Sequence, residues 1–136
     1  MSQSNGADLA VYFQHVEENG HLQTENNAQQ WSTAVLRALG MNLDKRTKKR
    51  LAKTLPEELA FDLTRKFWLL HFRDKNKPQN VFLKEVARMS GNTDAQFAIY
   101  PTRAVFHEVK GYAGEDVSDD VAESLAPEIR KLWQEA

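Results

Sequence analysis

Residues 24–40, TENNAQQWSTAVLRALG, contain the pattern that decides the fold. Their apolar residues recur at spacings of three and four positions, which places them on one face of an α-helix. The residues on this face are Ala28, Trp31, Val35, Ala38 and Leu39. Gly40, a residue type that commonly ends helices, follows directly. The stretch therefore predicts a helix that begins near Thr24 and stops at Gly40.

The same periodicity extends in both directions along the chain. A preceding helix is expected from about residue 7 to residue 18, with Gly20 at its end, and a following helix is expected from Asp44. The inward faces of these two helices contain Leu9, Phe13 and Val16, and Thr47, Leu51 and Leu55, respectively. Each segment thus predicts a helix with one buried face.

A fourth helix is expected to follow at once and to run to about Phe72. Thr54 and Glu57 have the spacing of a capping box, and Pro56 suits a first helical turn. The end of this helix is apolar on almost every side, through Phe61, Leu63, Phe67, Trp68, Leu69, Leu70 and Phe72. We favour burial of this end between two halves of the molecule. The alternative is that part of the Phe67–Phe72 turn is an exposed docking patch or dimer contact.

The second half of the chain has the same helical character. Residues 73–80, RDKNKPQN, contain Pro78 and no apolar residue, so they predict a linker. Helices are expected to resume at about residues 81–89, 94–109, 116–124 and 127–136. Pro101 should kink or split the second of these. Because strand signals are weak throughout, the predicted fold class is all-α, with about eight helices.

An ungapped shift of 70 residues brings the two halves into register. It pairs identical residues, namely Val16 with Val86, Ala28 with Ala98, Ala34 with Ala104, Val35 with Val105, Ala52 with Ala122, Leu55 with Leu125 and Glu58 with Glu128. The predicted helices and their breaks also coincide under this shift. We therefore predict two tandem four-helix repeats, about residues 7–72 and 81–136, joined by 73–80 within one domain of residues 1–136.

Composition bounds the class of protein. A chain of 136 residues fits one domain with a real core, and the lack of cysteine excludes disulfides, thiolate metal sites and a cysteine nucleophile. The first residues do not resemble a signal peptide, and no apolar run is long enough to span a bilayer. With a net charge of −1, no overall field attracts nucleic acid or acidic membranes. We expect a soluble, cytoplasmic protein that does not bind membranes.

Three segments resemble a known family, the small bacterial proteins catalogued as domain of unknown function 2267. They are AVLRAL at residues 34–39, LAKTLPEEL at residues 51–59, and a weaker echo, VAESLAPEI, at residues 121–129. The resemblance covers most of the chain from about residue 28. It implies an all-helical fold with a repeated leucine-proline helix start, although the second proline, Pro127, stands one residue later than Pro56. It implies no catalytic residue, since the family has no established activity.

One pattern has the spacing of a di-iron ligand pair. Glu18 and His21 form Glu-x-x-His, and His15 lies one helical turn before Glu18. Such a site needs a second copy of the pattern, which the chain lacks. Gly20 also ends the helix between the two side chains. We therefore interpret this segment as a solvated helix end and expect no metal or other cofactor.

The other two histidines stand alone, His71 and His107, each among apolar neighbours. We interpret both as core or boundary histidines with one hydrogen-bond partner. The chain contains no nucleophile elbow, phosphate loop, dinucleotide fingerprint or His-Glu-x-x-His pattern. An enzyme is therefore less favoured than a binding protein, and no catalytic residue is predicted.

The charges divide unevenly between the two halves. Residues 45–53 carry six bases, Lys45, Arg46, Lys48, Lys49, Arg50 and Lys53, on the side of the helix away from its buried face. The shift of 70 places five of them on acids, Glu115, Asp116, Asp119, Asp120 and Glu123. Equivalent faces thus carry opposite sign, which predicts a strong dipole. These eleven residues are the candidate interaction residues, and the alternative is that they only keep the protein soluble.

The function that we favour is a small cytosolic helical interaction module without catalytic activity, with a protein partner or weak, salt-sensitive self-association. The alternative is a binder of an anionic ligand or a nucleic-acid backbone through residues 45–53. Nucleic acid is less favoured because those residues include no aromatic side chain on which bases could stack. A small-molecule enzyme without a recognisable motif is third.

Overall fold

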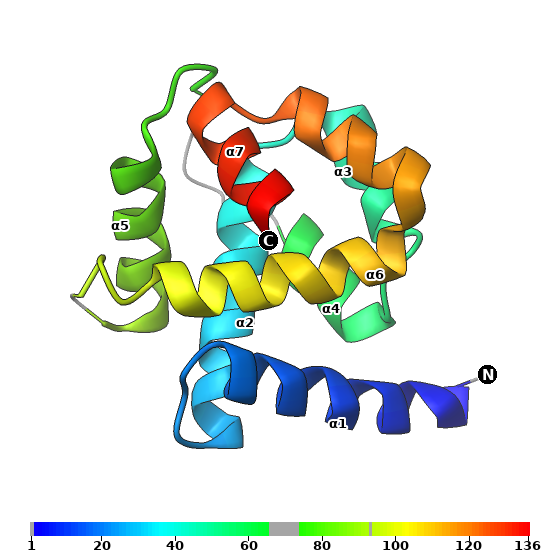
Figure 1. Ribbon diagram of the computed structural model, residues 1–136. Helices are drawn as coiled ribbons and strands as arrows, with labels where there is room; N and C mark the ends of the chain where they lie inside the picture. The colour runs from blue at the N-terminus through cyan, green and yellow to red at the C-terminus, as the bar shows by residue number, and fades with distance from the viewer. Residues whose placement is uncertain (1, 66–73, 93) are drawn as a thin grey trace.

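The computed structural model describes residues 2–65, 74–92 and 94–136, with the backbone alone described for residues 2–8. These residues form seven α-helices and no strand (Figure 1). The helices are α1 (Ser2–Asn19), α2 (Glu25–Met41), α3 (Lys45–Ala52), α4 (Glu57–Thr64), α5 (Gln79–Ser90), α6 (Ile99–Ser124) and α7 (Pro127–Glu135). The predicted all-α fold is confirmed. None of the helices described is long and apolar enough to cross a membrane.

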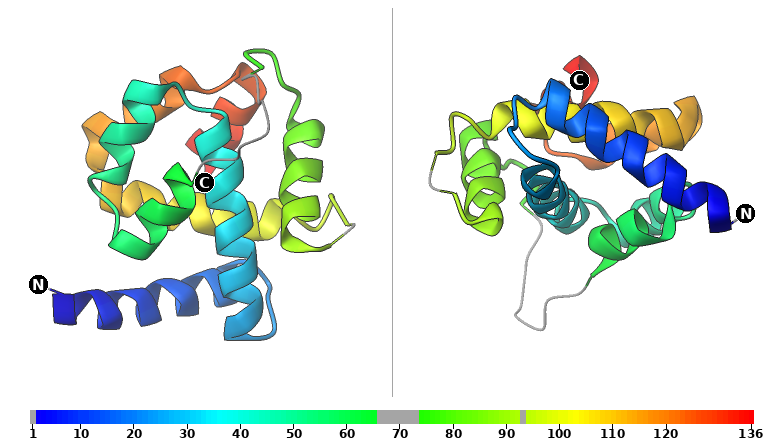
Figure 2. Two further views of the ribbon diagram at one scale, coloured as in Figure 1. Left: turned by 180° about the vertical axis from the view of Figure 1, so that it is seen from behind. Right: turned by 90° about the horizontal axis from the view of Figure 1, so that it is seen from below.

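Helix α2 lies at the centre, where it packs against α1, α4, α5 and α6 (Figures 1 and 2). It begins as predicted, because the Thr24 side chain accepts a hydrogen bond from the Asn27 backbone N–H at 3.1 Å. Gly40 does not end the helix, which continues to Met41. Gly40 instead allows the backbone of α4 to approach α2 closely, because a Cβ at position 40 would collide with the carbonyl oxygen of Leu63.

Helix α1 begins five residues earlier than predicted and ends at Asn19. The backbone N–H of Leu22 donates to the Glu17 carbonyl at 2.9 Å, which closes the last turn. The residue in the left-handed conformation is His21, with φ 60°, and not Gly20. Gly20 instead permits close packing, because a Cβ there would lie 3.1 Å from the Cα of Pro101 in α6.

Helices α3 and α4 pack against each other and against α2 or α6. Asp44 caps α3 by accepting from the Thr47 N–H at 2.8 Å, and Thr47, Leu51 and Leu55 are buried as predicted. The predicted capping box is wrong, because the Thr54 hydroxyl donates to the Leu51 carbonyl and α4 begins without a side-chain cap. Residues 66–73 lie outside the described part of the chain, and with them the predictions for His71 and for Phe67–Phe72.

Helix α6 has one of the two breaks that the sequence predicts, in the gap between residues 109 and 116, but not the other, at Pro101. Pro101 lies in its first turn, where a missing N–H costs no hydrogen bond, so the predicted kink at Pro101 is wrong. The kink is at Gly114, whose φ of 78° is in the left-handed region. The two arms of α6, before and after Gly114, replace two of the predicted helices. The described residues therefore form seven helices and not eight.

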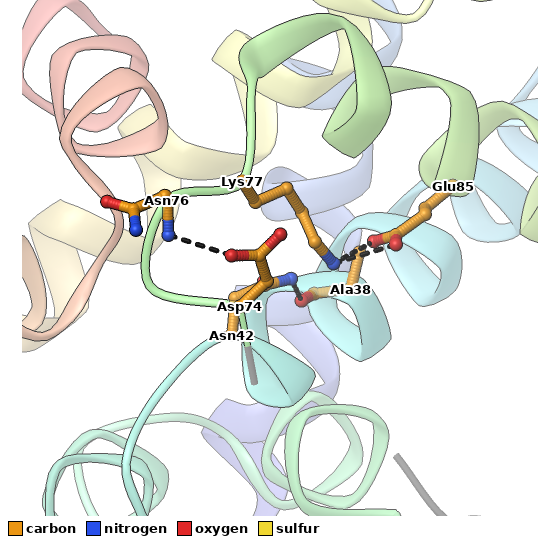
Figure 3. A network of polar contacts seen from close by, with 6 residues as sticks. All are labelled: Ala38, Asn42, Asp74, Asn76, Lys77 and Glu85. Carbon is orange, nitrogen blue, oxygen red and sulfur yellow. Dashed lines mark hydrogen bonds and ion pairs between the residues drawn. The ribbon is translucent and has the colours of Figure 1, made fainter. Parts of the chain in front are cut away.

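The turn before α5 contains a buried ion pair that the linker prediction did not include. The Lys77 side chain is buried, and its Nζ donates to both carboxylate oxygens of Glu85 in α5, at 2.8 and 2.7 Å (Figure 3). Close by, Asn42 closes the end of α2 by donating from Nδ2 to the Ala38 carbonyl at 2.7 Å (Figure 3). Residues 74–78 are therefore anchored to α5 and do not form a free linker.

Replacement of the two partners of this ion pair should have unequal effects. Glu85→Ala should lower the free energy of unfolding by about 2–4 kcal/mol, because it leaves the Lys77 ammonium buried without a counter-charge. Lys77→Met should cost about 1 kcal/mol or less, because methionine keeps the apolar stem and Glu85 is exposed enough to be hydrated. Urea denaturation measures both. Equal losses for the two variants would contradict the assignment of Lys77 as the desolvated member.

Candidate functional site

The two charged segments lie side by side on the molecule. The backbone N–H of Asp44, at the start of α3, donates to Oγ of Ser124, at the end of α6, at 2.9 Å. Farther along, Arg50 forms an ion pair with Asp120. Helix α3 and the second arm of α6 therefore run antiparallel and in contact. Bases and acids from the two halves of the sequence are therefore adjacent in the structure.

Four of the six predicted bases point to solvent. Lys45, Arg46, Lys49 and Lys53 are exposed, and none of them makes an ion pair within the described part of the chain. We call these four residues the basic strip. Lys48 and Arg50 are half-buried. The short helix that carries the strip is fixed from its other face by the buried Thr47 and Leu51.

Four of the five predicted acids are likewise exposed, on the second arm of α6. They are Glu115, Asp116, Asp119 and Glu123, which we call the acidic strip. The fifth, Asp120, is half-buried and pairs with Arg50. The structure thus brings all eleven candidate interaction residues into one region formed by α3 and the second arm of α6.

A second feature is a groove between α1, α2 and α4, with a volume of about 500 Å³. Its lining includes Phe13, Thr33, Glu57, Glu58, Phe61 and Asp62, and we call it the α4 groove. Phe61 is 60% exposed, the largest exposed fraction among the large apolar side chains described. The guanidinium carbon of Arg65 lies 5.6 Å from the centre of the Phe61 ring, which is a cation–π distance.

Asp62 is the partly desolvated carboxylate of the α4 groove. Its Oδ2 accepts a hydrogen bond from the Thr33 hydroxyl at 3.1 Å. Burial raises the pKa of Asp62 above its ordinary value, and the Thr33 hydrogen bond and the Arg65 guanidinium oppose part of that rise. Sequence reasoning missed this groove. Its carboxylates are visible in the sequence, but Phe13 and Thr33 are brought to them only by the packing of α1 and α2.

The histidines are separated from the acids that the sequence places near them. His15 contacts Glu108 of α6, with 3.1 Å between Nδ1 and Oε1, and does not pair with Glu18. His21 is exposed and stacks on Tyr100, with ring centres 4.4 Å apart. No group of three histidine, aspartate or glutamate side chains in the described ranges is placed to hold a metal ion.

The interpretation of His107 as a core or boundary residue is wrong. His107 is exposed, whereas its neighbours Val105, Phe106 and Val109 are buried. On a helix, positions 105, 106 and 109 share one face and position 107 points away from it. The apolar neighbours in sequence therefore do not enclose this side chain.

Comparisons with known proteins give a family but no activity. No curated protein matches the chain. A family model described as an uncharacterized conserved protein, DUF2267, matches residues 11–132, which include all of α2–α6, the second half of α1 and most of α7. This match covers the central packing of α2, both charged strips and the α4 groove. The chain therefore belongs to the DUF2267 family.

Proposed function

We propose that the chain is a small cytosolic, non-catalytic interaction module that binds an acidic surface of a protein through the basic strip. The observation that carries the proposal is the exposure of Lys45, Arg46, Lys49 and Lys53 with no ion-pair partner in the described residues. Buried contacts on the opposite face hold α3 in one orientation. Because the helix that carries these cations is already ordered, binding costs little backbone freedom, which favours recognition.

The neighbouring acidic strip favours a protein over a polyanion. The acids adjoin the bases through the Arg50–Asp120 pair, and charges this close lie within the screening length of physiological salt, about 8 Å. A nucleic-acid backbone that follows the basic strip meets repulsion from these acids. Phosphate contact alone would also be weak and independent of base sequence. A protein surface can instead present both signs of charge in matching positions.

Reversal of two bases should weaken partner binding. Lys45→Glu with Lys49→Glu should raise the dissociation constant about tenfold or more, because each lost pair becomes a repulsion. The matched control, Lys84→Glu with Lys131→Glu, changes the net charge equally at two exposed lysines elsewhere. Affinity capture from native cells at low salt compares the three proteins, followed by titration of the captured partner.

Two measurements accompany that comparison. A salt series should weaken partner binding by the wild-type chain, because exposed ion pairs are screened. Binding to a generic oligonucleotide tests the anionic-ligand alternative. Oligonucleotide binding that the Lys45→Glu, Lys49→Glu variant loses and the control keeps would contradict a protein partner and favour that alternative.

We also propose that the fold consists of two tandem repeats, about residues 7–72 and 81–136. The shift of 70 residues aligns α2 with the first arm of α6, α3 with its second arm, and α4 with α7. Paired positions are buried in both halves, including Ala34 with Ala104, Val35 with Val105 and Leu55 with Leu125. The packing supports a two-fold relation, because α1 packs on α6 and its counterpart α5 packs on α2.

One buried hydrogen bond in the first half provides a test of the two-fold relation, because the equivalent positions in the second half do not form it. The Tyr12 hydroxyl bonds to Oγ of Ser32 at 2.7 Å, and burial raises the pKa of Tyr12, which keeps the phenol protonated. The shift places Phe82 on Tyr12 and Thr102 on Ser32. Phe82 lacks the hydroxyl, and the buried Thr102 Oγ1 has no hydrogen-bond partner among the described residues.

Phe82→Tyr should therefore form a new hydrogen bond with Thr102. In a double-mutant cycle with Thr102→Val, the two side chains should show a favourable coupling of about 1 kcal/mol in the free energy of unfolding. Thr102→Val alone should be neutral or stabilising, because it removes an unsatisfied buried hydroxyl. Thermal or urea unfolding measures the cycle. Zero coupling would contradict equivalent positions for the pairs Tyr12–Ser32 and Phe82–Thr102.

A further inference from the structure

The α4 groove combines carboxylates with exposed aromatic surface. Glu57 and Glu58 are exposed at its edge and make no ion pair with another described residue, and Asp62 lies half-buried inside. Phe61 adds apolar area beside them. A long cationic side chain can cover the ring with its aliphatic stem and place its charge on a carboxylate. Within the same molecule, the guanidinium of Arg65 already lies over the Phe61 ring, which shows that the ring accepts a cation.

The complementary surface is present on the same chain. Lys45, Lys49 and Lys53 follow one another at intervals of four residues, so they form one row along α3. Glu58 and Asp62 have the same spacing on α4. No ion pair among the described residues joins the two rows within one molecule. Both rows are therefore free of each other within one molecule, and their opposite charges and equal spacing match between two molecules.

We infer that the partner is a second copy of this chain, with the basic strip of each copy bound in the α4 groove of the other. This inference rests on the proposed function of the basic strip. Helices α3 and α4 are consecutive and in contact, and the last residue of the basic strip, Lys53, is four residues before Glu57 at the edge of the groove. A two-fold axis between them makes both contacts at once, which closes the assembly as a dimer.

The acidic strip is a less favourable binding surface than the α4 groove for the basic strip of a second copy. Asp120 is already paired with Arg50 of its own molecule. The exposed large apolar side chains in the described residues are Val11, Phe61, Val81 and Tyr100, and none lies in residues 115–123. A contact there would consist of exposed ion pairs alone, whereas the α4 groove adds buried aromatic area at the centre of the contact.

The test is a charge exchange between the two surfaces, measured by sedimentation equilibrium of the full chain. One variant carries Lys45→Glu and Lys49→Glu, and the other carries Glu57→Lys and Glu58→Lys, all at exposed positions. Wild type should dimerise, and each variant alone should have a dissociation constant raised about tenfold or more, because both contacts become repulsive. An equimolar mixture should restore a one-to-one dimer, because both contacts become attractive again.

Two further variants separate the possible outcomes. Glu115→Lys with Asp119→Lys changes the acidic strip by the same charge and should leave the dimer intact. Phe61→Ser should weaken the dimer without any change of charge. Circular dichroism confirms that each variant remains folded.

The inference is overturned if wild type stays monomeric at millimolar concentration, if the charge-exchanged mixture does not associate, or if only the acidic-strip variant loses the dimer. In each of these cases the proposed function stands only if reversal of Lys45 and Lys49 still weakens capture of another protein partner. If reversal of Lys45 and Lys49 affects neither self-association nor partner capture, the proposed function fails as well.

Discussion

The enclosure of α2 is the constraint on which the rest of the structure depends. Four other helices pack on this one, so most of its surface after the first turns is buried and consists of apolar or small side chains. Val35, Leu36 and Leu39 are fully buried, and Gly40 leaves room for the backbone of α4 at Leu63. Any larger residue at position 40 would displace α4. Because α4 carries one wall of the groove and α3 packs on α4, both candidate surfaces depend on this contact.

The sequence predicts the helices well where the signal is local. Periodicity and caps locate the starts of α2, α3 and α7 to within about one residue, because Thr24, Asp44 and Pro127 act on the turn that they begin. The errors arise where two local rules compete. Thr54 bonds back to Leu51 instead of capping α4, and Pro101 occupies a first turn instead of an interior one. Sequence spacing alone does not distinguish these alternatives.

The candidate sites are predictable to the same extent. The bases of α3 and the acids of α6 are evident as charge runs, and the buried face of each helix determines which of them are exposed. Their adjacency is not evident, because it arises from the contact between two helices 70 residues apart, marked by Arg50 and Asp120. The buried Lys77 is unpredictable for the same reason. Its burial depends on Glu85 and on the end of α2, and a lysine in a polar segment carries no sign of either.

A helix as short as α3 is not stable by itself in water, so the basic strip exists only because the rest of the fold supports it. Asp44 caps its start, Ser124 holds the capping residue, and the buried Thr47 and Leu51 fix its rotation. The Arg50–Asp120 pair then anchors its last turn to α6. Arg50 is thereby paired within the molecule, whereas Lys45, Arg46, Lys49 and Lys53 remain exposed on a helix of fixed orientation. The division of the bases into anchored and exposed members follows from this support.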